Sequence, residues 1–252
     1  LNLKKKKKCK ITSIDSEHFC LANLLSFVKK KEINNVYITA SGGPFLNKRN
    51  DQISKIDPKL ALNHPSWKMG EKISIDSSTM SNKALEVMEA SILFDINPNK
   101  IKIKIHKECK VHAIIIMKNG LTYFASHNTS MKIPIENSLI NHNRILNQKN
   151  FFLEKKTFNL LFDEINLKNY KIIPLAYKAL KYGQRACIFF NVINDNLVNL
   201  YLNRKIFFYQ ISEKLNKVIN NNKLLKLFKK KINKRKDIYE TIQFAKVFSK
   251  TI

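Results

Sequence analysis

The period of the hydrophobic pattern changes along the chain, and this change limits the fold more than any other feature. In the first half, segments such as 101–105 alternate isoleucine with lysine, which is typical of strands. Beyond Pro174 the apolar residues recur at helical spacing, as in residues 208–218. The pattern therefore predicts a mixed α/β fold, with an α+β domain followed by a C-terminal α-helical bundle.

The first half is expected to contain several strands and one long helix. The strands are predicted at 33–40, 101–105, 111–117 and 121–125. Asn119-Gly120 separates the last two, and this dipeptide is typical of a hairpin turn. Residues 79–94 are predicted to form one amphipathic helix, since Asp76 and Ser77 can cap its start.

Composition divides the chain into four consecutive parts. We expect a basic N-terminal remnant at 1–10, a catalytic domain at 11–140, an Asn- and Lys-rich linker at 141–170, and a helical domain at 171–252. No apolar segment of a secretory signal is found near the start. Because the sequence begins with Leu1 and not Met, the true beginning is expected to be missing.

The chain is strongly basic, with 46 Lys plus Arg against 19 Asp plus Glu and a formal net charge of +27. Only five of these basic residues are arginine, the side chain favoured for bidentate contacts to phosphate and guanine. The excess of lysine therefore indicates a general basic drift of the surface and does not favour nucleic-acid binding. Apolar stretches are much shorter than the roughly 20 residues of a membrane span, so no membrane is expected as a partner.

Asp15 and Glu17 are the first candidates for chemistry. In an extended segment, residues two apart point to the same side, so both carboxylates can share one cation. Mg²⁺ and Mn²⁺ prefer such oxygen ligands, and a third carboxylate would complete the site. The alternative is that both residues are ordinary surface charges.

A second group lies around the start of the predicted helix 79–94. Ser77 would lie where free N–H groups attract an anion, and Asn82 and Lys83 would add donors, which suits a phosphate. Glu86 shares this helix face and could be the third metal ligand. The alternative is an ordinary capped helix with an exposed Lys–Glu pair.

Residues 64–70 contain the only tryptophan of the chain, Trp67, between a proline and a glycine. Such a segment is a candidate lid that covers a small substrate and excludes water. The alternative is a tryptophan packed on the core beside a structural histidine. His106 and His112, farther along, are expected to be structural.

Four motifs together resemble one family. They are Asp-Ser-Glu-His at 15–18, Thr-Ala-Ser-Gly-Gly-Pro-Phe at 39–45, His-Pro-Ser-Trp-Lys-Met-Gly at 64–70 and KISIDSSTMSNKALE at 72–86. Their order and spacing resemble the signature blocks of the 1-deoxy-D-xylulose 5-phosphate reductoisomerase family. Weaker resemblance continues through 106–112 and 183–195.

The resemblance implies an enzyme of non-mevalonate isoprenoid biosynthesis. Such an enzyme rearranges a sugar phosphate, 1-deoxy-D-xylulose 5-phosphate, and reduces the product with NADPH to 2-C-methyl-D-erythritol 4-phosphate. It also implies a Mn²⁺ or Mg²⁺ cofactor, a homodimer, and a location in the cytoplasm, or in the plastid stroma of a plastid-bearing cell.

The resemblance also assigns roles to individual residues. The metal ligands, which are also the catalytic residues, would be Asp15, Glu17 and Glu86. Substrate would be bound by Ser16, Glu17, Ser41, His64, Ser77, Asn82, Lys83 and Glu86. Trp67 and Met69 would belong to the closing flap, and Gly70 would lie beside NADPH.

The sequence departs from the family pattern in a few places. Ala84 stands where the family usually has Gly, Ser81 where it has a second Met, and Lys107-Glu108 where it has Pro-Gln after His106. None of these changes removes a proposed ligand.

The family places a Rossmann-type NADPH domain before the block at 15–18, and the 252 residues contain no G-x-G-x-x-G fingerprint. The expectation is a fragment from which the Rossmann domain is absent and which is inactive alone. The rival prediction is a non-catalytic, Lys-rich, nucleic-acid-binding protein that retains relic motifs.

Overall fold

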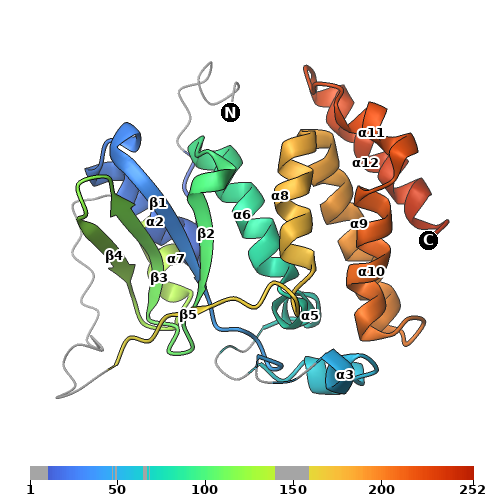
Figure 1. Cartoon of the computed structure of the whole chain (residues 1–252), viewed down its shortest axis with the longest axis horizontal. Coiled ribbons are helices and arrows are strands. Elements are labelled where there is room, and N and C mark those ends of the chain that lie inside the picture. The colour runs from blue at the N-terminus through green and yellow to red at the C-terminus, as the bar shows by residue number, and fades with distance from the viewer. Residues whose placement is uncertain (1–10, 47, 49, 65–66, 68, 140–158) are drawn as a thin grey trace. The chain divides into compact units, whose positions relative to one another are not determined.

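A computed structural model describes residues 11–139 and 159–252, except 47, 49, 65, 66 and 68. The chain forms two compact units, each built from two stretches (Figure 1). Among the described residues, those within 1–41 and 89–165 form the first unit, and those within 42–88 and 166–252 form the second. This division is based on packing and joins stretches that are distant in the sequence. The domain boundaries predicted from the sequence, at 11–140, 141–170 and 171–252, therefore stay a prediction.

The first unit is built on a five-stranded sheet with the order β4-β3-β1-β2-β5. Its strands are β1 (Ile33–Ala40), β2 (Ile101–Ile105), β3 (Val111–Met117), β4 (Thr122–Ser126) and β5 (Asp163–Glu164). β1 and β2 are parallel, and the other pairs are antiparallel. The four predicted strands are confirmed to within one residue. β5 falls in the predicted linker and was missed, because two residues are too few to show a period.

Helix α2 (Ser16–Phe27) packs on β3 and β4 of this sheet. Two short 3₁₀ turns, Lys30–Glu32 and Pro98–Lys100, precede β1 and β2. Helix α7 (Lys132–Leu139) follows β4. Alternate residues of β2 are buried, as its sequence pattern predicts. The predicted mixed α/β fold class is thereby confirmed.

The helix predicted at 79–94 is confirmed to within two residues, and a separate helix that was not predicted precedes it. α5 (Glu71–Thr79) ends at Met80, whose backbone is left-handed with φ of 64°, and α6 (Ser81–Phe94) follows. Ser78 and Thr79 donate to the carbonyl of Ile75 at 2.8 and 3.0 Å, and such bonds compete with helix continuation. The capping role predicted for Asp76 and Ser77 was therefore wrong.

The second unit is mostly helical. Besides α5 and the start of α6 it contains α3 (Asn50–Ile53), α4 (Pro58–Ala61), α8 (Ile172–Tyr182), α9 (Gln184–Leu202), α10 (Phe208–Ile219), α11 (Asn222–Phe228) and α12 (Arg235–Ser249). α9 is the central helix and packs against α5, α8, α10, α11 and α12. The predicted stripe of α10 is buried, which confirms the helical bundle.

Apolar residues recur at helical spacing along α12, at Ile238, Ile242, Ala245 and Phe248, but not all of this stripe is buried. Ile238 is 39% exposed, and Thr241 is buried instead. The reason is a buried arginine, Arg185, which donates to the Thr241 hydroxyl and to the carbonyl of Lys230. A buried guanidinium requires acceptors, so the threonine turns inward.

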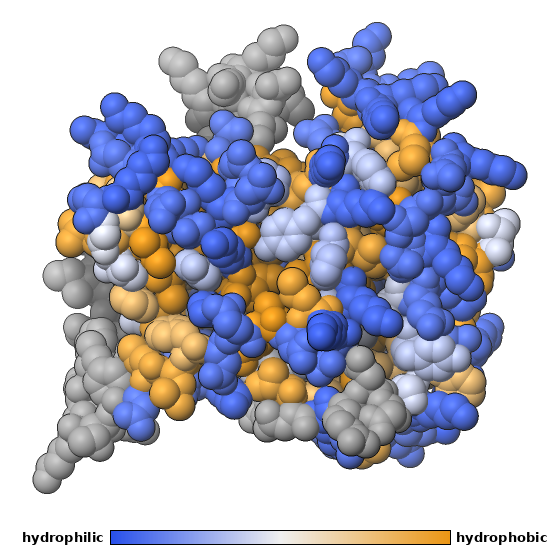
Figure 2. All heavy atoms as spheres, in the orientation of Figure 1, coloured by the Kyte–Doolittle hydropathy of each residue, from blue (hydrophilic) through white to orange (hydrophobic). Residues whose placement is uncertain are grey.

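Hydrophilic side chains are spread across the face of the molecule in Figure 2, with hydrophobic side chains between them. Among the described residues, no helix is both long and apolar enough to cross a membrane.

Candidate functional site

The carboxylates of Asp15 and Glu17 meet at the start of α2 in the first unit. Asp15 is the N-cap and accepts a hydrogen bond of 2.9 Å from the His18 N–H. Carboxylate oxygens of Asp15 and Glu17 lie within 4.8 Å of each other. The sequence predicted an extended segment here, but the two residues lie at the start of a helix. The N-cap position of Asp15 still brings its carboxylate close to that of Glu17. Ser16, which is buried, donates to Glu17.

His18 links this pair to a further acid. Its buried ring places Nδ1 3.4 Å from Asp15 Oδ1 and 3.5 Å from Glu89 Oε2. Burial raises the pKa of Glu89, while His18 opposes this shift. Glu89 was missed from the sequence, although its spacing from Glu86 places both on one face of a helix.

Three predicted residues meet at the start of α6 in the second unit. Glu86 accepts from the Lys83 ammonium at 2.6 Å and from the Asn82 amide at 2.5 Å. Lys83 is 5% exposed and Glu86 is 3% exposed, so the alternative of an exposed Lys–Glu pair was wrong. Burying two charges is costly unless they pair well, so a buried ion pair adds little to the stability of the fold. Such a pair therefore indicates a specific site.

Ser77 lies in the last turn of α5, not at a helix start. The loop around Gly43, which follows β1, packs directly against the Ser77 backbone. A Cβ on Gly43 would lie only 2.9 Å from the Ser77 carbonyl oxygen. Ser41 is two residues before Gly43 along the chain. This close approach brings the loop and the end of α5 together.

His64 and Trp67 are joined within the segment 64–70. The Trp67 backbone N–H donates to His64 Nδ1 at 3.0 Å, so the neutral ring carries its hydrogen on Nε2. Burial lowers the pKa of His64, which favours this neutral form. Trp67 and Met69 are half-buried. Gly70 is the exposed N-cap of α5, and a Cβ there would meet no atom within 4 Å.

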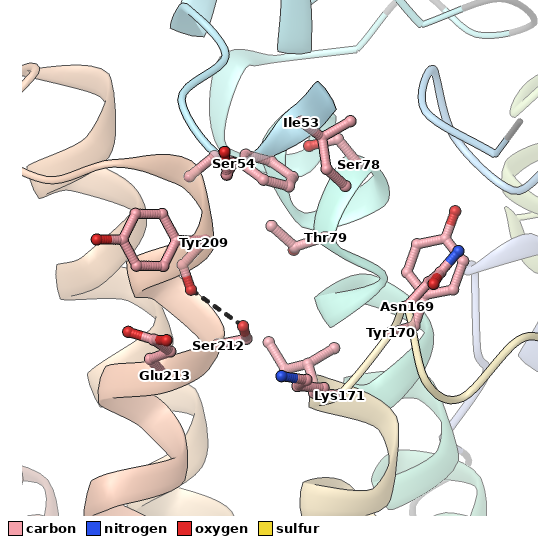
Figure 3. Close-up of a pocket in the computed structure, with 12 residues that line it drawn as sticks. Ile53, Ser54, Ser78, Thr79, Asn169, Tyr170, Lys171, Tyr209, Ser212 and Glu213 are labelled. Atoms are coloured by element: carbon pink, nitrogen blue, oxygen red, sulfur yellow. Dashed lines mark hydrogen bonds between the residues drawn. The ribbon is translucent and has the colours of Figure 1, made fainter. Parts of the chain in front are cut away.

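A cavity of about 280 Å³ lies in the second unit between α5, α8 and α10 (Figure 3). Its lining includes Ser78 and Thr79, which follow Ser77 in the sequence. The predicted site residues are not part of this lining. The cavity therefore lies beside the predicted phosphate residues and does not contain them.

His106 and His112 are both buried. His106 Nδ1 lies 2.9 Å from the Leu161 carbonyl, and His112 Nε2 lies 3.3 Å from the His127 carbonyl. The rings of His112 and His127 stack at 3.9 Å. These contacts agree with the structural role expected from the sequence.

Comparison with known families identifies the chain. A model of the 1-deoxy-D-xylulose 5-phosphate reductoisomerase C-terminal domain matches residues 11–94. A second model, the DXP reductoisomerase C-terminal domain, matches residues 127–248. Two parts of one class of enzyme thus follow each other along the sequence. The chain belongs to the 1-deoxy-D-xylulose 5-phosphate reductoisomerase family and corresponds to its C-terminal part.

Individual relatives agree with this assignment. The chain is 38% identical to the reductoisomerase of Thermoanaerobacter sp. (strain X514), over 84% of this chain and 56% of that protein. It is 41% identical to that of Pelagibacter ubique (strain HTCC1062), over 86% and 56%. The chain therefore spans little more than half the length of these curated relatives.

A solved structure of DOX-P reductoisomerase in complex with NADPH, fosmidomycin and magnesium superposes with a TM-score of 0.89 at 28% identity. The match covers 98% of this chain and 64% of that one.

Proposed function

We propose that the chain is the metal- and substrate-binding part of an enzyme that converts 1-deoxy-D-xylulose 5-phosphate to 2-C-methyl-D-erythritol 4-phosphate with NADPH. The observation that carries this proposal is the buried Lys83–Glu86 pair with Asn82 on α6. Family membership and the relatives named above support it. Those relatives are bacterial, which supports the cytoplasm as the place of action.

The proposed metal ligands are Asp15, Glu17 and Glu86. Glu86 and Glu89 are three residues apart on α6, and this spacing places two side chains on one helix face. Because Glu89 contacts His18 and His18 contacts Asp15, the spacing supports a position of Glu86 near the carboxylate pair. Three carboxylates are the oxygen donor set that Mg²⁺ and Mn²⁺ prefer, so these residues fit the cation.

When bound, the cation would polarise the sugar oxygens and stabilise negative charge during the carbon–carbon rearrangement. Ser16, buried beside Glu17, is proposed to contact the sugar backbone.

The phosphate of the substrate is proposed to bind Ser41, His64, Ser77, Asn82 and Lys83. An ammonium has three N–H donors, so Lys83 can hold Glu86 and donate to a phosphate oxygen at once. His64 offers Nε2–H, since its Nδ1 accepts from Trp67. Lys83 would thereby tie the phosphate end of the substrate to a metal ligand, which fixes the distance between the two ends.

Trp67 and Met69 are proposed to close over the bound substrate, and Gly70 is proposed to lie beside NADPH. The open space around Gly70 fits such an approach. The 252 residues carry no Gly-rich dinucleotide fingerprint, so no step of hydride transfer is assigned to the residues described here.

Replacing Lys83 tests the phosphate assignment. Lys83→Ala is expected to weaken binding of 1-deoxy-D-xylulose 5-phosphate by about 1.5–3 kcal/mol, because a charge-assisted hydrogen bond is lost. Binding of the unphosphorylated sugar should change little. Calorimetry with both sugars in the presence of Mg²⁺ measures the difference. Lys104→Ala, which removes a lysine–glutamate ion pair from the sheet, is the matched control. An equal loss for both sugars would contradict the assignment.

We also propose that the chain forms a homodimer through β4. In the described part of the chain no strand pairs with the outer side of β4. Tyr123 is 39% exposed and Phe124 is 51% exposed, and they lie on opposite faces of this edge strand. An exposed apolar edge strand is a template for pairing with a second copy.

Light scattering of the purified chain tests the dimer. We expect Phe124→Lys to convert a dimer into a monomer, because it places a charge on the pairing edge. Phe207→Lys changes an equally exposed aromatic of the second unit and should leave the dimer intact. A monomeric wild-type chain under the same conditions would show that β4 is not an interface.

A further inference from the structure

A buried amide joins the two helices that carry the proposed phosphate residues. Asn194 on α9 is 0% exposed. Its Nδ2 donates to Asp76 Oδ1 on α5 at 2.7 Å, and its Oδ1 accepts from Ser81 Oγ on α6 at 2.9 Å. One side chain therefore bridges the end of α5 and the start of α6.

Further polar contacts surround this bridge. The hydroxyls of Ser81 and Thr79 lie 2.7 Å apart, on either side of Met80. The Lys72 ammonium lies 2.6 Å from Asp76 Oδ2 and 3.0 Å from Asp195 Oδ1. Burial raises the pKa of Asp76, and Lys72 opposes this shift, so the carboxylate depends on its partners.

The bridge holds a backbone turn that is otherwise unfavourable. Met80 has φ of 64° and ψ of 15°, a left-handed conformation that is unfavourable for a residue with a Cβ. Such conformations persist only where surrounding contacts determine them. Here Asn194 supplies contacts on both sides of the turn, to Asp76 before it and to Ser81 after it.

The two anchor points of the bridge directly precede the proposed phosphate residues. Asp76 is followed by Ser77, and Ser81 is followed by Asn82 and Lys83. We propose that Asn194 is a positioning residue, which sets Ser77 relative to Asn82 and Lys83 so that all three reach one phosphate. This inference rests on the function proposed above.

The experiment compares three single alanine variants of the whole chain, and a double variant that combines the two changes in the bridge. Asn194→Ala and Ser81→Ala each break the bridge without removing a proposed phosphate ligand. Asn196→Ala is the matched control, because Asn196 donates from the same helix to the Ser249 carbonyl at 3.1 Å, away from the turn. Calorimetry in Mg²⁺ gives the affinity for 1-deoxy-D-xylulose 5-phosphate and for the unphosphorylated sugar, and circular dichroism reports the fold.

We expect both bridge variants to lose affinity for the phosphorylated sugar on the order of tenfold, with little change for the unphosphorylated sugar. Asn196→Ala should bind as wild type even where its melting temperature falls. Because both changes break one bridge, the double variant should lose little more than Asn194→Ala alone. A merely structural role would not alter the ratio between the two sugars.

Wild-type affinity in a folded Asn194→Ala and Ser81→Ala, together with weakened binding by Lys83→Ala, would overturn the positioning role and leave the proposed function standing. If Asn194→Ala does not fold, Ser81→Ala decides, because it removes one hydroxyl and keeps a good helix former. A wild-type chain that does not prefer the phosphorylated sugar would refute both proposals.

Discussion

Gly43→Ala is expected to destabilise the chain by several kcal/mol and to weaken sugar-phosphate binding about a hundredfold. Gly43 has φ of 67°, a left-handed conformation that alanine rarely adopts. The added Cβ would also lie 2.9 Å from the Ser77 carbonyl oxygen and 3.2 Å from the Ser78 Cα. These are backbone atoms, so either the loop or the last turn of α5 must move.

Gly120→Ala separates the cost of the left-handed backbone from the cost of the close Cβ contact. Gly120 in the hairpin has φ of 89°, and a Cβ there would meet no atom within 4 Å. The free energy of unfolding of this variant should therefore fall only by the cost of the left-handed backbone, roughly 1–2 kcal/mol. Its sugar-phosphate binding should be retained. Denaturant unfolding and calorimetry give both quantities. Equal effects in the two variants would show that Gly43 does not pack on a binding element.

The sequence was sufficient to predict the elements whose signals are local. β2 shows the alternation of Ile101–Ile105, and the hairpin shows Asn119-Gly120. The stripe of α10 has helical spacing throughout. Each of these signals lies within a few residues, so no knowledge of distant contacts was required.

The break at Met80 could not be predicted in the same way. The predicted helix included Thr79 and Met80, and methionine is a good helix former, so no local signal marks the break. The turn depends on Asn194, which lies 113 residues from Ser81 in the sequence. A contact of such separation leaves no mark on local periodicity.

Contacts between residues that are distant in the sequence also limited the prediction of the candidate site. The residue types and spacing of Asn82, Lys83 and Glu86 indicated a charged cluster, because all three share one helix face. Their burial was not predictable, since spacing alone also fits an exposed pair. Glu89 was missed because its partner, His18, lies far away in the sequence.

Asp15→Asn is expected to lower the affinity for Mn²⁺ by at least about tenfold, since it removes one of three proposed anionic ligands. The fold should remain, because Asn caps a helix as well as Asp does and the Asp15 side chain is 38% exposed. Asp57→Asn is the matched control. Asp57 caps α4 by accepting from the Lys59 N–H at 2.9 Å, and its side chain is 39% exposed.

Glu86→Gln tests the third ligand, and its effect should be larger. The change removes an anionic ligand and also leaves the Lys83 ammonium buried without its carboxylate. Breaking one side of a buried ion pair costs about 3–5 kcal/mol, so this variant should lose both metal affinity and stability. Mn²⁺ relaxation at several protein concentrations, with unfolding measured in parallel, separates the two losses. If Asp15→Asn and a folded Glu86→Gln bind Mn²⁺ as tightly as Asp57→Asn does, the three carboxylates do not share a cation.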